Sequence, residues 1–188
     1  MMTHYLDLKL LPDPEVGSAE LMGALFTRLH LAFVHFKINS IGVSFPQYSC
    51  NPLAIGNVLR LHGTETALAQ FVNLSWMKGV RDHVRLGEIA SIPRDVKWRT
   101  LKRKQFKTNV ERLRRRRMRR KSETAEQATR AIPARVERKP DLPFVHFTST
   151  STSQTFPIYL ELGDAQPEPT YGTFNTYGLS ASVTVPWF

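Results

Sequence analysis

The chain has 188 residues, 41% of them hydrophobic and 10% aromatic, and a formal net charge of +10. This composition indicates a globular protein with one large domain or two small ones, and it excludes a wholly disordered chain. The one cysteine, Cys50, excludes an intrachain disulfide framework and suits a reducing cytoplasm.

The N-terminal part of the sequence shows the periodicities of alternating strands and amphipathic helices. Leu6, Leu8 and Leu10 alternate along a strand, and an apolar stripe then follows helical spacing, formed by Met22, Leu25, Phe26, Leu29, Phe33 and Phe36. The expected elements are a strand over 4–11, a helix over 18–37 with Ser18 as its N-cap, strands over 41–45 and 57–62, a helix over 65–72 extending loosely to Trp76, and a strand over 83–92. The order β-α-β-β-α-β predicts an α+β protein with a ferredoxin-like N-terminal domain over 1–94.

A second domain over 95–188 is predicted to begin after Ser91–Asp95. It starts with an extended basic stretch over 96–107, followed by an arginine-rich helix over about 109–121 and a polar helix over 122–132. After a proline-bracketed linker, strands are expected over 144–149 and 156–162, and the tail over 171–188 is rich in glycine and aromatic residues. This domain is also predicted to be α+β.

Charge is concentrated in one segment. Residues 97–121 hold 14 of the 26 Lys and Arg residues and only one acidic residue, Glu111, so this segment has a net charge of +13 and the rest of the chain a net charge of −3. A segment of this kind indicates binding to a polyanion, and nucleic acid is the first candidate because clustered cations release condensed counterions from a phosphate backbone.

On a helix over 110–121, five arginines share one face: Arg112, Arg115, Arg116, Arg119 and Arg120. Val110, Leu113 and Met118 lie away from that face and are available for packing. A solvated surface helix usually interleaves glutamates with its arginines, and this one has only Glu111. Composition alone leaves DNA and RNA open, with an anionic membrane or an acidic protein as less favoured partners.

Metal sites and membrane segments are not expected. The 6 histidines lack the spacing of paired metal ligands, and no glycine-rich phosphate loop is present, so we expect neither a metal nor another cofactor. No run of about 18 apolar residues predicts a membrane span, and the N-terminus has the pattern of a strand instead of a signal peptide.

Several motifs together resemble the CRISPR repeat-cleaving endoribonucleases of subtype I-F, the Csy-type ribonucleases. They are the opening HYLDLKLLPDPE, the strand IGVSFP, Leu86-Gly87-Glu88, the arginine helix, Asp141-Leu-Pro-Phe-Val145, Tyr177-Gly-Leu-Ser180 and the ending Val185-Pro-Trp-Phe188. The resemblance covers nearly the whole chain. It implies cleavage of the precursor transcript 3′ of a repeat stem-loop without a metal ion, by attack of a ribose 2′-hydroxyl on the adjacent phosphate to leave a 2′,3′-cyclic phosphate.

The resemblance also implies the catalytic residues. His30 on the first helix corresponds to the family's catalytic histidine, and its helical position at the edge of the apolar stripe is also that of a structural histidine. Ser149 corresponds to the serine that orients the attacking ribose, with Ser151 as its rival. Tyr177 corresponds to the tyrosine near the histidine, although a core tyrosine is an equally ordinary interpretation.

Recognition residues carry over in the same way. Arg103 and Gln105 correspond to the pair that reads base edges, for which Arg with guanine and Gln with adenine are natural partners. Phe156 corresponds to the aromatic residue that stacks on the terminal base pair. The arginines Arg116, Arg119 and Arg120 correspond to residues that hold stem phosphates, and Arg112, Arg115 and Ser151 are also expected to contact RNA.

The resemblance predicts an enzyme that is a monomer when free, stays on the CRISPR RNA hairpin and joins other subunits of a type I-F complex in a prokaryotic cytoplasm. One alternative is a hairpin-binding subunit that does not cleave. A basic ribosomal or DNA-binding structural protein also fits the charge, but it leaves the coincidence of His30, Ser149 and Tyr177 unexplained.

Overall fold

The structure is a computed structural model that describes residues 2–106, 110–133, 141–149 and 152–188. The chain forms two compact units. The first consists of Met1–Lys104 together with Leu142–Phe188, and the second of Gln105–Asp141. The predicted domain boundary near residue 94 therefore lies inside the first unit. The prediction of a mixed α+β class is confirmed.

The larger sheet of the first unit is antiparallel and has the strand order β2-β5-β1-β6, with β7 also paired to β1. Its strands are β1 (His4–Leu10), β2 (Gly42–Ser44), β5 (Val58–Gly63), β6 (Val84–Leu86) and β7 (Ala90–Ser91). Leu6 and Leu8 are directly opposite Leu61 and Leu59 on the neighbouring strand. Hydrophobic alternation thus sets the register, because a slip of one residue would turn these leucines out of the core.

The expected single strand over 83–92 was wrong. Residues Arg81–His83 form a 3-10 turn, and the rest divides into β6 and β7. Leu86 is opposite Leu8 and Ala90 is opposite Tyr5. The chain therefore advances by four residues from Leu86 to Ala90, while β1 advances by three residues between their partners. The extra residue cannot pair and must bulge, which interrupts the strand.

A second sheet has the order β10-β11-β9, and two short pairs complete the first unit. The second sheet consists of β10 (Phe144–Thr148), β11 (Thr155–Leu162) and β9 (Leu101–Lys104). The short pairs are β12 (Val185–Trp187) with β8 (Lys97–Arg99) and β3 (Ser49–Cys50) with β4 (Leu53–Ala54). The last pair lies between the expected strands over 41–45 and 57–62, where no further element was predicted.

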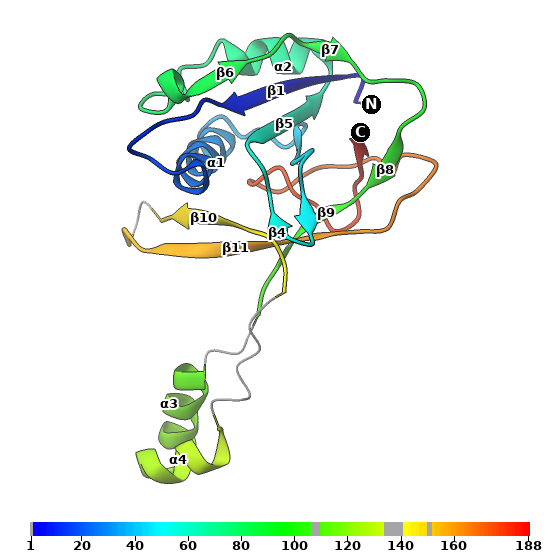
Figure 1. The fold of residues 1–188 in the computed structure, drawn as a ribbon. Coiled ribbons are helices and arrows are strands. Elements are labelled where there is room, and N and C mark those ends of the chain that lie inside the picture. Colours follow the sequence, from blue (N-terminus) through cyan, green and yellow to red (C-terminus); the bar gives the residue numbers. More distant parts are fainter. Residues whose placement is uncertain (1, 107–109, 134–140, 150–151) are drawn as a thin grey trace. The chain divides into compact units, whose positions relative to one another are not determined.

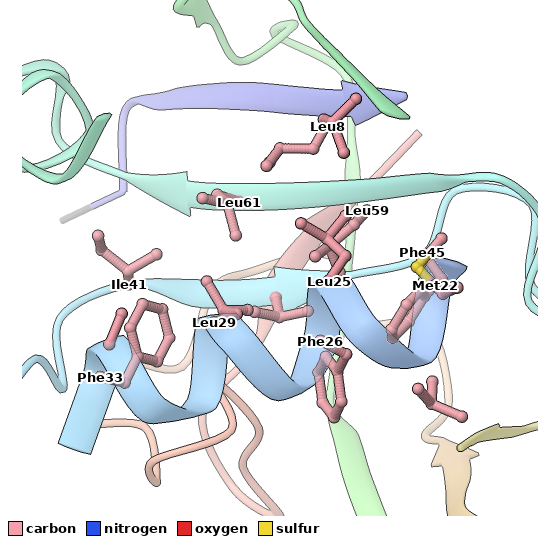
Figure 2. Close-up of a cluster of buried hydrophobic side chains, with 14 of the residues drawn as sticks. Leu8, Met22, Leu25, Phe26, Leu29, Phe33, Ile41, Phe45, Leu59 and Leu61 are labelled. Atoms are coloured by element: carbon pink, nitrogen blue, oxygen red, sulfur yellow. The ribbon is translucent and has the colours of Figure 1, made fainter. Parts of the chain in front are cut away.

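Helix α1 (Ser18–His35) lies between the larger sheet and β10, as Figure 1 shows. Helix α2 (Glu65–Val72) has the predicted bounds without the expected loose extension to Trp76. The apolar stripe of α1 is buried at Met22, Leu25, Phe26, Leu29 and Phe33. In Figure 2, Leu25 and Leu29 extend from the helix toward Leu59 and Leu61 of the sheet, and Phe26 extends from the other side of the helix. Two details of the prediction were wrong. The N-cap is Gly17 instead of Ser18, and Phe36 follows the helix with 42% of its surface exposed.

Close contact between α1 and β10 depends on a glycine. A Cβ atom on Gly23 would lie 2.6 Å from the carbonyl oxygen of His146, so any larger residue would push the strand away from the helix. Farther along, the backbone N–H of Thr148 donates to Oγ1 of Thr27, 3.3 Å away. This contact places the end of β10 one helical turn from His30.

The second unit contains α3 (Val110–Lys121), which matches the predicted arginine helix, and α4 (Ala125–Ala131). Thr124 begins α4 through a capping box, in which its hydroxyl accepts from the Gln127 N–H and the Gln127 side chain accepts from the Thr124 N–H. Among the described residues, no helix is long and apolar enough to cross a bilayer.

Candidate functional site

His30 occupies the face of α1 that looks toward the C-terminal loop of the first unit. Its Nδ1 atom lies 2.9 Å from the carbonyl oxygen of Thr176, 146 residues away in the sequence. A carbonyl oxygen only accepts hydrogen bonds, so Nδ1 carries the proton and donates it. In the neutral ring, Nε2 is therefore the atom with the lone pair that can accept a proton.

Two aromatic rings hold the imidazole of His30. The ring of Tyr177 is stacked on it, with centroids 4.1 Å apart and an interplanar angle of 12°, and Phe147 of β10 makes an edge contact at 5.2 Å. This half-buried setting lowers the pKa of His30, chiefly because burial disfavours the charged ring and secondarily because Arg103 is positive. The hydrogen bond to Thr176 partly opposes this decrease of the pKa.

Arg103 and Phe156 adjoin the same cluster. The guanidinium carbon of Arg103 lies 5.7 Å from the centroid of the Tyr177 ring and 5.8 Å from that of Phe156. Phe156 packs against Phe147 at 5.4 Å. Antiparallel pairing of β9 with β11 sets Arg103 opposite Leu160, which brings a cation from the basic stretch to the histidine. Such a cation is suited to bind a phosphate beside a proton acceptor.

Ser149 follows β10 directly and belongs to the turn into β11. Its N–H donates to the carbonyl of Gln154 at 2.9 Å, and its hydroxyl accepts from the N–H of Thr152 at 3.4 Å. The contact of the preceding Thr148 with Thr27 brings this turn to the α1 face that carries His30. The rival candidate, Ser151, lies outside the described residues.

The arginines of α3 divide into two sets. Arg112, Arg115, Arg116, Arg119 and Arg120 line one hollow along the helix, which is the grouping that helical spacing predicted. The other two stabilise the helical pair. Arg114 donates to the Ile132 carbonyl at 3.0 Å and contacts Glu111, and Arg117 makes a two-point ion pair with Glu123 at 2.6 and 3.1 Å.

The acidic partner of Arg117 thus lies beyond the helix, and counting only the acids within 110–121 missed it. The side chain hydrogen bonds of Glu123 and Arg117 lower the pKa of Glu123 and raise that of Arg117. Arg114 and Arg117 are engaged on the α4 side, whereas the five arginines that line the hollow concentrate positive charge on another face of α3, which suits an anionic ligand.

Gln105, which was predicted to read a base edge, is exposed and belongs to the second unit, whereas His30 and Tyr177 belong to the first. Two contributors were missed altogether, the carbonyl of Thr176 and the ring of Phe147, because neither a backbone oxygen nor a core phenylalanine has a sequence signature. Among the residues that the structure describes, no three His, Cys, Asp or Glu side chains are grouped as metal ligands would be.

Comparison with known proteins gives a consistent result. Residues 5–188 match the family model described as "CRISPR-associated protein (Cas_Csy4)". A protein from Escherichia coli (strain UTI89 / UPEC) is 40% identical over 187 residues, and one from Pseudomonas aeruginosa (strain UCBPP-PA14) is 43% identical over 187 residues. Each alignment covers 100% of both proteins, and both relatives are named "CRISPR-associated endonuclease Cas6/Csy4". The chain therefore belongs to the Csy4 family of CRISPR-associated proteins.

Proposed function

We propose that the chain is an endoribonuclease that cleaves CRISPR precursor transcripts on the 3′ side of the repeat stem-loop, without a metal ion. Family membership supports the reaction class, and the observation that carries the proposal is the state of His30. Its Nδ1 proton is held by the Thr176 carbonyl, which leaves Nε2 as the acceptor, and burial keeps the ring neutral near pH 7. These are the properties of a general base.

In the proposed reaction, Nε2 of His30 accepts the proton of the ribose 2′-hydroxyl. The 2′-oxygen then bonds to the adjacent phosphorus, and the bond from phosphorus to the 5′-oxygen of the next nucleotide breaks. The leaving oxygen takes a proton from the protonated imidazole or from water. One fragment ends in a 2′,3′-cyclic phosphate and the other begins with a 5′-hydroxyl, so atoms and charge balance without a further reactant.

Three other residues complete the proposed cleavage site. Ser149 lies in the turn that approaches the His30 face of α1, and we assign its hydroxyl to the attacking ribose, with Ser151 as the alternative. Tyr177 keeps the imidazole in one plane through the stacked contact. Arg103, whose guanidinium carbon lies 5.7 Å from the Tyr177 ring, adds positive charge beside this cluster, and its side chain is assigned below to a base edge.

The second part of the proposal concerns recognition of the hairpin. The five-arginine face of α3 is assigned to the phosphates of the stem, through Arg112, Arg115, Arg116, Arg119 and Arg120. Arg103 and Gln105 are assigned to base edges in the major groove near the foot of the stem. Phe156 is assigned to stacking under the terminal base pair, which is worth about 1–3 kcal/mol for a contact of this kind.

Product retention follows from this assignment, because the same arginines hold the stem before and after cleavage. We therefore propose that the enzyme, a monomer when free, remains on the CRISPR RNA as one subunit of a type I-F complex in the bacterial cytoplasm. We also assign residues 1–94 to a ferredoxin-like domain and 95–188 to the RNA-hairpin-binding part. The strand order β2-β5-β1-β6, with two helical crossovers, supports the first assignment.

The alternative is a family member that binds the hairpin without cleaving it. A histidine with only a structural role needs burial and a hydrogen bond, and nothing more. His30 in addition has a fixed tautomer, an adjacent cation and a ring that is only half-buried. This combination favours the enzyme. Mass spectrometry of the ends produced from a repeat RNA tests the proposal, because only 2′-hydroxyl attack gives a cyclic phosphate paired with a 5′-hydroxyl.

A further inference from the structure

The loop that holds His30 is built around one side chain that the cleavage chemistry does not use. Oδ1 of Asn175 accepts hydrogen bonds from the backbone N–H groups of Tyr177, at 2.9 Å, and Leu179, at 3.1 Å. The backbone closes the same turn, since Asn175 N–H donates to the Leu179 carbonyl at 3.0 Å and Gly178 N–H donates to the Asn175 carbonyl at 2.9 Å. Asparagine is suited to such turns because its side chain can take the place of a backbone acceptor.

The first of these bonds acts on the peptide that contacts His30. The carbonyl of Thr176 and the N–H of Tyr177 belong to one planar peptide unit, and in a trans peptide they point in opposite directions. Asn175 holds the N–H at 2.9 Å on one side, and Nδ1 of His30 is 2.9 Å from the carbonyl on the other side. Rotation of this peptide would break both bonds at once.

Backbone hydrogen bonds fix both ends of the loop, whereas the peptide between Thr176 and Tyr177 is held by the side chain of Asn175. Phe174 N–H donates to the Asn39 carbonyl, and Ser180 N–H donates to the Leu101 carbonyl, each at 2.9 Å. Gly178 has a positive φ of 70°, and a Cβ there would collide with Val43 of β2, so the loop can approach the sheet only with glycine at this position. The peptide between Thr176 and Tyr177 is the part that faces the imidazole.

We propose that Asn175 is a positioning residue for cleavage, which acts through the Thr176 carbonyl to fix His30 in the tautomer with its proton on Nδ1. The same bond sets the backbone that carries the Tyr177 ring, so one amide oxygen controls both the hydrogen bond and the stack on the imidazole. The inference rests on the proposed function of His30 as a general base, and its central claim about the tautomer can be measured without any RNA.

The test uses the full chain and three variants, Asn175→Ala, Asn175→Asp and Ser180→Ala. The tautomer and pKa of His30 are read from the ¹⁵N shifts of its ring, assigned with His30→Gln, and the rate is measured by single-turnover cleavage of repeat RNA. In Asn175→Ala we expect a growing share of the Nε2-protonated tautomer, a His30 pKa below that of the wild type because the hydrogen bond to Thr176, which raises it, is weakened, and a cleavage rate lower by about 10- to 100-fold. Hairpin affinity is expected to stay within about twofold of the wild-type value, since phosphate contacts dominate it.

The other two variants separate positioning from stability. Asn175→Asp keeps an oxygen acceptor and should restore the Nδ1-protonated tautomer and most of the rate, although its charge itself raises the pKa of His30. Ser180→Ala removes a hydroxyl that accepts from Ser182 and Val183 in the same C-terminal segment, at 3.2 and 3.0 Å, and should change neither the tautomer nor the rate.

A wild-type tautomer and pKa in Asn175→Ala would overturn the inference, and so would a rate that falls only in step with thermal stability and RNA binding. If the wild-type protein fails to cut RNA, the proposed function is wrong. In that case the ring shifts still report whether Asn175 controls the His30 tautomer, so the two failures are distinguishable.

Discussion

The imidazole of His30 and the phenol ring of Tyr177 are nearly parallel, with centroids 4.1 Å apart and an interplanar angle of 12°. Tyr177 itself packs on the buried ring of Phe26 at 6.0 Å and 22°. The histidine is therefore the outer member of a three-ring stack that is anchored in the core. Its rotation about the Cβ–Cγ bond would break this stack and the bond to Thr176 together, so the ring is oriented before RNA binds.

The first prediction concerns pH. Because burial and Arg103 lower the pKa of His30, this imidazole, the proposed general base, is neutral down to a pH below the ordinary histidine value of about 6.5. The acid limb of kcat/KM, which reports the free enzyme, should then have its midpoint below about 6.5. Cleavage rates at subsaturating RNA across the pH range measure it. A midpoint above that value would mean that the charged ring is stabilised in the free protein.

The second prediction compares neighbouring arginines. Arg116→Ala should weaken binding of stems of every sequence and reduce the slope of log Kd against log salt by about 1, the contribution of one phosphate contact. Arg117 pairs with Glu123 at 2.6 Å, so Arg117→Ala should lower the thermal stability of the helical pair with a smaller change of the salt slope. Titrations at several salt concentrations, with circular dichroism melts, measure both. Equal salt slopes for Arg116→Ala and wild type would remove Arg116 from the phosphate contacts.

The third prediction concerns base reading by Gln105. A glutamine amide can make two hydrogen bonds to adenine, so Gln105→Ala should reduce discrimination at one base pair of the stem by about 1–3 kcal/mol. Competition binding with a set of single-pair substitutions in the stem measures this difference. Gln127→Ala, which changes a glutamine in the α4 capping box, serves as the control. Losses of similar size on all stems would instead indicate a general contact.

The fourth prediction concerns stability. His62 is fully buried beside Ser44, with Nε2 and Oγ 2.7 Å apart, and burial, aided by the charge of Arg60, lowers its pKa to about 3. In the unfolded chain the pKa is about 6.5. Above this pH the ring is neutral in both the folded and the unfolded state, and His62 causes no loss of unfolding free energy. As the pH falls from about 6.5 towards 3, only the unfolded chain takes up the proton, so the free energy of unfolding decreases.

Urea unfolding at several values between about pH 7 and pH 5 measures this loss. Two variants identify its source. His62→Leu should reduce the dependence of unfolding free energy on pH, whatever its own stability, whereas the exposed His35→Gln should leave that dependence unchanged. If His62→Leu keeps the full dependence on pH, another group is responsible.

Some of this structure could be predicted from local pattern. The arginine helix was predicted to within about one residue, and the helix over 65–72 was predicted apart from its loose extension to Trp76, because apolar and charged residues recur at helical spacing there. The interruption between β6 and β7 could not be predicted, since it depends on the count of residues against β1. The Gly17 N-cap was missed because Ser18, a better capping residue, lies next to it.

In the candidate site, too, features set by local pattern could be predicted and contacts between distant residues could not. Helical projection placed His30 at the border of the buried stripe, and it is half-buried there. Its partner Thr176 contributes a backbone carbonyl oxygen from 146 residues away. Every residue type has such an oxygen, so the sequence could not predict this contact. Asn175 was likewise not distinguished from any other loop asparagine. The sequence therefore predicts His30 as the candidate base, whereas the contacts that hold its ring are visible only in the structure.

The most direct test of the central claim is incubation of the protein with its own end-labelled repeat RNA in EDTA, beside His30→Ala and the control His35→Ala. We expect one cut 3′ of the stem by the wild-type protein and His35→Ala, and no cut by His30→Ala, which should still bind the hairpin with nearly unchanged affinity. Tight binding without cleavage by the wild-type protein, or cleavage that disappears in EDTA, would contradict that claim.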